Sequence, residues 1–276
     1  MPASAPPRLT DRAALERHRA RAARAPAMFL RALMVADIQE RLGEINRTFT
    51  APALVSPFPE LWADALPGAT AVADTGTLAL VPGAHDLLIH DLCLHWADDP
   101  VGQLVQARHA LQPDGLLIAT LFGGQTLHEL RTALAEAEAR VSGGLSPRVA
   151  PMGEIRMLGT LLQRAGFALP VADNIVTVVD YPSPLALMHD LRAMGEGNAL
   201  AHRLRRPTRR RVFEAAAETY AGHFGRDGRI PATFEMVVLT GWAPHPDQQQ
   251  PLRPGSARAR LADALGVAEN PLDSDP

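Results

Sequence analysis

The chain has 276 residues, which suffices for one large domain or for one domain with appendages. Hydrophobic residues make up 47 % and charged residues 21 %, as is ordinary for a soluble globular protein. The net charge of −3 gives no electrostatic reason to expect nucleic acid as a partner. All 27 basic residues are arginines, a bias typical of GC-rich bacterial genomes, so catalysis by lysine is excluded.

The cysteine count and the hydropathy pattern exclude further classes of protein. Cys93 is the single cysteine, so an internal disulfide is impossible and a cysteine-based metal site is not expected. No apolar run reaches the roughly 18 residues that a membrane span needs, and the N-terminus shows no apolar signal-peptide segment. No cluster has the spacing of metal ligands. The sequence therefore predicts a cytoplasmic bacterial protein with no transmembrane segment and no metal.

Residues 1–48 are expected to form an N-terminal helical arm. A helical pattern begins at Thr10 or Asp11, either of which can cap a helix, and it is interrupted near Pro26. Apolar residues recur at helical spacing in the second part of the arm and predict a buried stripe. They are Leu30, Leu33, Met34, Ile38 and Leu42.

Residues 49–247 alternate between short apolar runs and helical patterns, which is typical of a mostly parallel sheet with helices on both faces. The expected strands are 51–55, 69–74, 77–81, 85–96, 115–122, 174–182 and 230–244, the last of a length that suits a sheet edge. The expected helices are 59–66, 101–111, 126–140, 154–167, 184–200 and 208–224. Thr126 is expected to cap one of them and Gly166 to end another. Residues 248–276 form a polar tail, with a weak helical pattern at 257–266.

The count and order of these elements predict an α/β fold of the class I S-adenosylmethionine-dependent methyltransferase (Rossmann-like) type. Its sheet would be seven-stranded and mostly parallel, with helices inserted before the sixth and seventh strands. Ligands of such sheets bind beyond the carboxyl ends of the strands. The candidate site residues are therefore those that follow the strands.

Six motifs give the chain a more specific resemblance. They are LHWADDP (94–100), QPDGLLIATLFGGQTLHELR (112–131), GGLSPRVAPM (143–152), LLQRAGF (161–167), DLRAMGEGN (190–198) and IPATFE (230–235). LHW and PDG are shared by many methyltransferases, whereas FGG-TL-ELR, GG-SPR and MGE-N in this order are much more specific. Over roughly residues 94–256 the chain resembles the methyltransferase-fold family of complex I (NADH:ubiquinone oxidoreductase) assembly factors. That family is related to the biotin-pathway methyltransferases of malonyl carrier protein.

The resemblance implies a methyltransferase domain, S-adenosylmethionine as its cofactor, and a role in assembling the respiratory complex. It also implies a complex I subunit or another protein as the partner, and a place in the cytoplasm or at the periphery of the inner membrane. For the mitochondrial members it implies hydroxylation of a protein arginine.

The front half of the domain departs from the family pattern. These methyltransferases carry an acidic residue in the first strand and a G-x-G-x-G loop after it, because the cofactor lies against bare backbone and accepts from its N–H groups. The corresponding stretch here is PALVSPFPELW (52–62), which has no glycine and no acid in the strand. Pro57 and Pro59 each lack an N–H, and Phe58 places a ring where open backbone is expected. The sequence therefore predicts weakened or lost cofactor binding.

The residues at the carboxyl ends of the second and fourth expected strands are the remaining candidates for the cofactor site. Asp74 can accept hydrogen bonds from ribose hydroxyls or cap the turn that follows it. Asp91, Leu94 and Trp96 would line the adenosyl site, and Trp96 can instead pack under the next helix. His95 is the candidate catalytic residue, because an imidazole at the mouth of the cleft can move a proton, and its alternative is also packing.

Six further residues are candidates for contact with a substrate or partner. They are Asp98, Gly123, Gly124, Glu129, Glu196 and Asn198. Each has a structural alternative: the aspartate can cap a helix, as can its neighbour Asp99, the glycines can form a tight turn, and the others can end a helix or form ion pairs. Arginines between residues 203 and 211 can dock an acidic partner or simply face solvent.

These observations support two functional hypotheses and a third that rests on the resemblance alone. The first is an S-adenosylmethionine-dependent methyltransferase with a degenerate cofactor loop. The second, favoured by the SPFP stretch, is a non-catalytic assembly or chaperone protein that binds a respiratory-chain subunit. The third, hydroxylation of a protein arginine, finds no iron-binding triad in the sequence. Binding of S-adenosylmethionine would separate the first hypothesis from the others.

Overall fold

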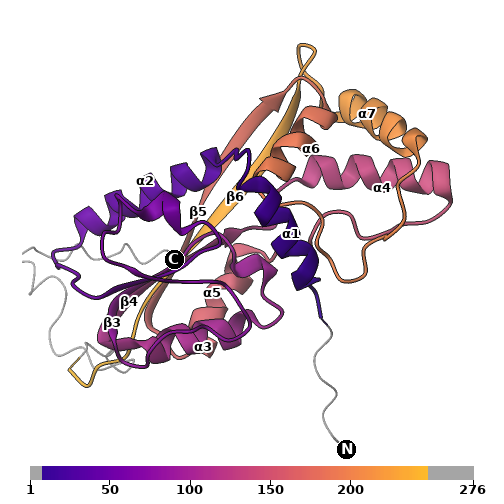
Figure 1. The fold of residues 1–276 in the computed structure, drawn as a ribbon. Helices are drawn as coiled ribbons and strands as arrows, with labels where there is room; N and C mark the ends of the chain where they lie inside the picture. Colours follow the sequence, from indigo (N-terminus) through magenta and orange to yellow (C-terminus); the bar gives the residue numbers. More distant parts are fainter. Residues whose placement is uncertain (1–7, 248–276) are drawn as a thin grey trace, which may run out of the picture. The chain divides into compact units, whose positions relative to one another are not determined.

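The computed structural model describes residues 8–247, and those up to Pro244 belong to one compact unit. Two N-terminal helices, α1 (Arg12–Ala22) and α2 (Phe29–Glu44), precede the sheet (Figure 1). The carboxylate of Asp11 caps α1 by accepting a hydrogen bond from the N–H of Ala14 at 3.1 Å. Pro26 lies in the break between the helices, as the sequence predicts.

The strands form one mixed sheet of the class I methyltransferase type. They are β1 (Pro52–Val55), β2 (Thr70–Val72), β3 (His85–His90), β4 (Leu111–Phe122), β5 (Ala168–Tyr181) and β6 (Ile230–Trp242). Their order is β2-β1-β3-β4-β6-β5. The first four are parallel to one another, whereas β6 runs antiparallel to both β4 and β5. Apart from its strand count, the predicted α/β class I fold is therefore confirmed.

Helices cover both faces of this sheet, and two short 3₁₀ turns follow β1 and β3. The remaining helices are α3 (Pro100–Ala110), α4 (His128–Ser142), α5 (Ile155–Arg164), α6 (Pro184–Ala193) and α7 (Arg210–Phe224), and the turns are η1 (Pro59–Trp62) and η2 (Leu94–Trp96). Helices α3 and α5 pack on one face, and α2, α4, α6 and α7 contribute to the core on the other (Figure 1). Alternate strand residues point to opposite faces, so Leu87 and Ile89 enter one core and Leu88 the other.

The sheet has six strands among the described residues, and the predicted strand at 77–81 is wrong. The backbone around this segment bonds to side chains of α3 instead of to a strand. Gln106 accepts from the N–H of Leu78 at 2.8 Å and donates to the carbonyl of Gly76 at 3.0 Å. Val81 is 66 % exposed, so the apolar run does not enter the core.

The predicted edge position of the last strand is also wrong. β6 lies between β4 and β5, and most of its residues are buried. The edge on this side of the sheet is β5, which pairs with β6 over nearly its whole length, and the opposite edge is β2. A strand that pairs on both sides and is covered on both faces is apolar over its full length, so length alone did not indicate an edge.

Two local expectations are corrected and two are confirmed. Leu33 is 47 % exposed and falls outside the buried stripe. Thr126 does not cap α4, because its hydroxyl donates to the carbonyl of Glu235, and the helix begins after Leu127. Gly166 follows α5 with a φ of +82°, a conformation that favours glycine. Asp99 caps α3 by accepting from the N–H of Gly102 at 2.8 Å. The expected helix at 257–266 lies outside the described residues.

Candidate functional site

Three polar side chains lie at the carboxyl ends of the parallel strands, where ligands of such sheets bind. Ser56 follows β1, Asp74 comes two residues after β2, and Asp91 follows β3 directly. The hydroxyl of Ser56 donates a hydrogen bond to Oδ2 of Asp91 at 2.6 Å. None of the three is more than 3 % exposed, so a ligand reaches them only if other side chains move away.

Two arginines of α1 hold the carboxylate of Asp74. Nη1 of Arg19 donates to Oδ1 of Asp74 at 2.6 Å. Arg12 lies 3.4 Å from the same carboxylate and donates to the carbonyl of Asp74 at 2.6 Å. Burial alone would raise the pKa of Asp74, but the two guanidiniums outweigh it and lower that pKa. The carboxylate expected to bind ribose is thus ionised and bound by the protein's own N-terminal helix.

One arginine of α2 holds Asp91 in the same way. Nη1 of Arg31 donates to Oδ2 of Asp91 at 2.9 Å, and its Nη2 lies 3.4 Å from Oε1 of Glu196. The guanidinium also donates to the carbonyls of Asp91 and Leu92. Burial opposes the charge on Arg31, yet the two carboxylates raise its pKa. Arg31 is therefore a buried cation that neutralises two buried anions.

The proline-bracketed ring fills the space between these groups. Phe58 is 2 % exposed, and its N–H donates to the hydroxyl of Ser56 at 3.0 Å. The guanidinium carbon of Arg31 lies 5.1 Å from the centre of the Phe58 ring, within the range of a cation–π interaction. A Cβ added to Gly195, which follows α6, would lie 3.4 Å from the far end of the same ring. The segment after β1 is therefore packed closed.

S-adenosylmethionine does not fit this edge in the pose that class I methyltransferases use. That pose needs bare backbone donors after β1 and a free carboxylate after β2. Here Phe58 and Pro59 stand where the bare backbone donors would be, and Arg19 binds the carboxylate of Asp74 that would have to be free. Arg19 and Arg31 would also repel the positively charged sulfonium of the cofactor. The glycine-rich loop of the family is degenerate in this chain.

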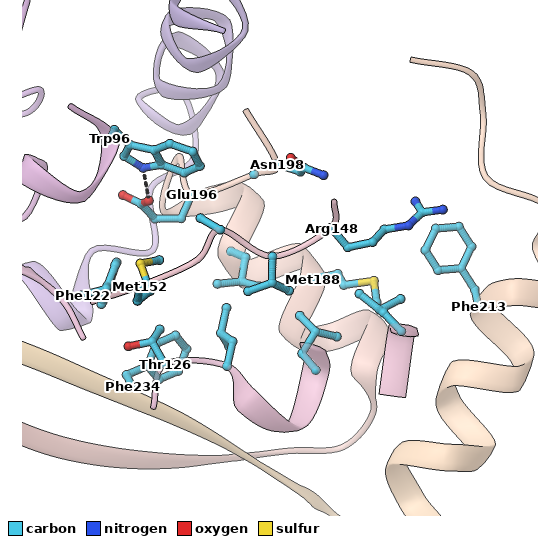
Figure 2. A pocket seen from close by; sticks show the side chains of 17 residues that line it. Trp96, Phe122, Thr126, Arg148, Met152, Met188, Glu196, Asn198, Phe213 and Phe234 are labelled. Atoms are coloured by element: carbon cyan, nitrogen blue, oxygen red, sulfur yellow. Dashed lines mark hydrogen bonds between the residues drawn. The ribbon is translucent and has the colours of Figure 1, made fainter. Parts of the chain in front are cut away.

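Glu196 joins Arg31 to the residues of η2. Its Oε2 accepts from Nε1 of Trp96 at 2.7 Å (Figure 2). The same oxygen lies 3.2 Å from Nε2 of His95. Burial raises the pKa of Glu196, but His95 and Arg31 lower it more, to about 2. The His95 ring packs 4.9 Å from that of Phe122. His95, the candidate catalytic residue, is thus buried against a carboxylate that is itself held by a guanidinium.

The residues between Asp91 and His95 are core residues. Leu94 is 1 % exposed and packs in the core on the α3 side of the sheet. Burial raises the pKa of the Cys93 thiol well above its usual value, so the cysteine stays protonated at neutral pH. Leu94 therefore presents no free surface to a ligand in this structure.

Asp98 fastens the N-terminal arm to the domain. Its Oδ1 accepts from the N–H groups of Leu9 and Thr10, at 2.8 and 2.9 Å. The hydroxyl of Thr10 donates to the carbonyl of Trp96 at 2.9 Å. The helix cap that the sequence allows at Asp98 is supplied by Asp99 instead.

Gly123, Gly124 and Glu129 lie where β4, β6 and α4 meet. A Cβ added to Gly123 would lie 2.7 Å from the carboxyl carbon of Glu235, so only glycine fits there. The carboxylate of Glu129 accepts from both the N–H and the hydroxyl of Thr233. In this structure Gly123 and Glu129 join these elements, and a contact of any of the three residues with a substrate remains a prediction.

A separate cavity of about 250 Å³ brings three of the predicted residues together. Trp96, Glu196 and Asn198 line it, among apolar side chains of α4 and α6 (Figure 2). Asn198 donates to the carbonyl of Pro147 at 2.8 Å and accepts from the N–H of Leu200 at 3.1 Å. Asp74, Asp91, Asp98, Gly123, Gly124 and Glu129 are not in the lining of this cavity.

The arginines of the N-terminal helices are the site residues that the sequence predictions missed. The sequence did contain one indication of Arg31. This charged residue lies on the buried face of α2 that also carries Met34 and Ile38. A charged residue on a buried helix face needs a buried partner of opposite charge. Its partner could not be named from the sequence, since Asp91 is 60 residues away along the chain.

The described residues also bear on metal binding and on membrane insertion. Residues 8–247 contain no group of three or more histidine, cysteine, aspartate or glutamate side chains placed to hold a metal ion. None of the helices in this part of the chain is both long enough and apolar enough to cross a membrane.

Comparison with known proteins gives relatives of two kinds. The chain is 38 % identical over 211 residues to the arginine-hydroxylase NDUFAF5 of Danio rerio, which covers 76 % of this chain and 65 % of the relative. It is 37 % identical to human NDUFAF5 over 74 % of this chain and 59 % of the relative. It is 35 % identical to a malonyl-[acyl-carrier protein] O-methyltransferase of Xylella fastidiosa, over 64 % of this chain and 58 % of the relative. The chain thus spans less than two thirds of the length of these relatives.

No family model matches the chain. Among solved structures, the YcgJ protein of Bacillus subtilis has a TM-score of 0.46 and 9 % identity, over 77 % of this chain and 99 % of that one. A phosphoethanolamine N-methyltransferase of Haemonchus contortus has a TM-score of 0.40 and 9 % identity, over 76 % of this chain and 53 % of that one. The motifs, the sheet order and the two groups of sequence relatives make this chain similar, over about three quarters of its length, to the methyltransferase-fold NDUFAF5 proteins and to the malonyl-[acyl-carrier protein] O-methyltransferases.

Proposed function

We propose that this chain is a non-catalytic member of its family, an assembly protein that binds a polypeptide subunit of a bacterial respiratory NADH:ubiquinone oxidoreductase. The observation that carries the proposal is the closed cofactor edge. Asp74 and Asp91 are bound by Arg19 and Arg31, and Phe58 fills the space beside them. Methyl transfer requires a methyl donor at this edge, and binding a polypeptide does not. The proposed place of action is the cytoplasm, at the periphery of the inner membrane.

The alternatives have less support in the described residues. A methyltransferase would have to move two buried ion pairs and a buried ring before the cofactor could bind. A hydroxylase, as the NDUFAF5 relatives are named, needs a way to activate oxygen, and the usual 2-His-1-carboxylate iron site has no counterpart in residues 8–247. An assembly role needs only a surface that accepts another chain.

The outer edge of the sheet supplies such a surface. β5 pairs with β6 on one side, and no strand of residues 8–247 pairs with it on the other. Val176 and Val178 lie on one face of this strand and are 56 % and 57 % exposed. An uncovered strand edge with exposed β-branched side chains can pair with an extended segment of another polypeptide. The backbone supplies the affinity and the two valines supply apolar contact.

Calorimetric titration of the purified chain with S-adenosylmethionine is expected to show no binding up to millimolar ligand. The physical reason is that the ligand would have to break the Arg19–Asp74 and Arg31–Asp91 ion pairs. It could not replace both of them with ion pairs of its own to the two carboxylates. The malonyl-[acyl-carrier protein] O-methyltransferase of Xylella fastidiosa serves as the positive control. Binding in the micromolar range would support the methyltransferase hypothesis instead.

Changing Val176 and Val178 to lysine together is expected to abolish capture of complex I subunits by the tagged chain in its own host. Lysines on a strand edge oppose pairing with a further strand, and both positions are exposed, so the fold is retained. Capture is measured by affinity purification and mass spectrometry. Val81→Lys is the matched control, since Val81 is 66 % exposed but lies in a loop. Equal capture by the double variant would place the partner elsewhere.

A further inference from the structure

Two neighbouring cavities share Arg148 as a common wall. The first is the apolar cavity of about 250 Å³ already described. The second, of about 290 Å³, lies between the end of α4, the loop after it and the start of α7, and it is lined by Arg148, Arg206 and Arg209 among others. Their volumes together fall within the roughly 300–1,000 Å³ that small-molecule sites occupy. One is apolar and the other is basic.

The polar side chains of the apolar cavity are already engaged within the protein. Glu196 is bound by Trp96, His95 and Arg31. The hydroxyl of Thr126 is bonded to the carbonyl of Glu235. The amide of Asn198 is bonded to the backbone of Pro147 and of Leu200.

A ligand in this cavity must therefore do without hydrogen bonds to these side chains. A peptide backbone would bury N–H and C=O groups without partners, which costs free energy for each group. A hydrocarbon chain has no such groups. The lining thus favours an aliphatic chain over an extended peptide.

The basic cavity carries more positive charge than its acidic side chain balances. Its one acid, Glu138, is neutralised by Arg148 at 2.6 Å and also accepts a hydrogen bond from the hydroxyl of Ser146. The same contacts, against the opposing effect of burial, lower the pKa of Glu138. Arg206 and Arg209 are exposed and make no ion pair within the described part of the chain. In a chain of net charge −3, such a local excess of positive charge fits an anionic ligand.

The two cavities lie in series. Figure 2 shows Arg148 and Phe213 at one end of the apolar cavity and Trp96 and Phe122 at the other. A chain that enters from the Arg148 end would run toward Trp96 and leave its head beside Arg206 and Arg209. Arginine suits a phosphate head, because its planar guanidinium binds phosphate through two hydrogen bonds at once.

We propose that these two cavities bind a single amphiphile that carries an aliphatic chain and a phosphate head group, such as one molecule of an anionic phospholipid. The chain occupies the apolar cavity, and the phosphate is held by Arg206 and Arg209 at the mouth. The site shares no residue with the β5 edge, so its failure and the failure of the assembly function are distinguishable. It would retain the protein at a membrane that supplies the lipid.

The test is calorimetric titration with monomeric alkyl phosphates of increasing chain length. Affinity is expected to rise by about fourfold for each methylene added until the cavity is filled. Inorganic phosphate has the head group without the chain, and a decyl trimethylammonium salt has the chain without the phosphate. Both are expected to bind far more weakly than decyl phosphate. Inorganic phosphate that binds as tightly as decyl phosphate would overturn the proposal, as would an acidic peptide that does so.

Variants at the mouth separate the head group from the chain. Arg206→Glu and Arg209→Glu are each expected to weaken decyl phosphate about tenfold or more. Arg164→Glu is the matched control, because Arg164 is exposed, makes no ion pair with a described residue and lies on α5. Met188→Trp, which narrows the apolar cavity from α6, should abolish the dependence on chain length. Binding to anionic vesicles without binding to the monomeric amphiphile would indicate a flat surface contact and contradict the site.

Discussion

Replacing Arg31 by methionine is expected to lower the free energy of unfolding by about 3–5 kcal/mol, because it removes one partner from a buried ion pair. Methionine retains much of the side-chain volume, so the loss reports on charge more than on packing. Asp91 and Glu196 would be left as buried carboxylates without their shared cation. Unfolding in urea, followed by tryptophan fluorescence, gives the free energy for each variant.

Arg17→Met provides the matched control for this prediction. Arg17 lies on α1, is exposed and pairs with none of the acids of residues 8–247, so its replacement should change stability by less than about 0.5 kcal/mol. Adding Asp91→Asn to Arg31→Met should restore part of the loss, because it removes one of the stranded charges. A loss below about 1 kcal/mol for Arg31→Met would mean that the pair is not a buried one in solution.

Replacing Glu196 by glutamine is expected to flatten the dependence of stability on pH in acid. The folded protein holds the pKa of Glu196 at about 2, below its ordinary value of 4.5. The unfolded chain therefore binds this proton first as the pH falls, and the difference corresponds to about 3 kcal/mol of stability. That contribution is fully present above pH 4.5 and is lost as the pH falls toward about 2. The variant lacks it at every pH.

The measurement is the free energy of unfolding from neutral pH down to about 2, for both proteins. The gap between them should be largest near neutrality and should close in acid. Glu60→Gln, at an exposed glutamate of η1, should leave the pH profile of the wild-type chain unchanged. A constant gap across the whole range would show that Glu196 contributes through packing and not through its charge.

Most of the sheet could be predicted because its strands are short buried runs that alternate with helices. The segment 77–81 shows where this reasoning ends. It is as apolar as β1, but the N–H of Leu78 bonds to the side chain of Gln106 in α3. The two residues just before the segment, Thr75 and Gly76, bond to Gln103 and Gln106 of the same helix. The place of β6 was missed for a similar reason. Whether a long apolar strand lies inside the sheet or at its edge depends on which strands pair with it, and no local pattern carries that information.

The departure of the loop after β1 from the family pattern could be predicted from the sequence. The side chains that fill its place could not. The missing glycines and the prolines around Phe58 indicated that the cofactor loop was lost, since they act on the backbone where they stand. The groups that fill the place come from far away in the sequence. Arg19 reaches Asp74 across 55 residues and Arg31 reaches Glu196 across 165. Ion pairs between residues so far apart in the sequence depend on the fold. The composition of the helical arm therefore did not indicate them.

The guanidinium groups of Arg19 and Arg31 also bear on any attempt to engineer a cofactor site at this edge of the sheet. Three buried carboxylates, Asp74, Asp91 and Glu196, take their positive partners from the N-terminal helices. Glycines introduced after β1 would leave both arginines in position. Removing the arginines alone would leave the buried acids without cations. We therefore expect that such a site requires substitutions in the helices and in the loop after β1 together.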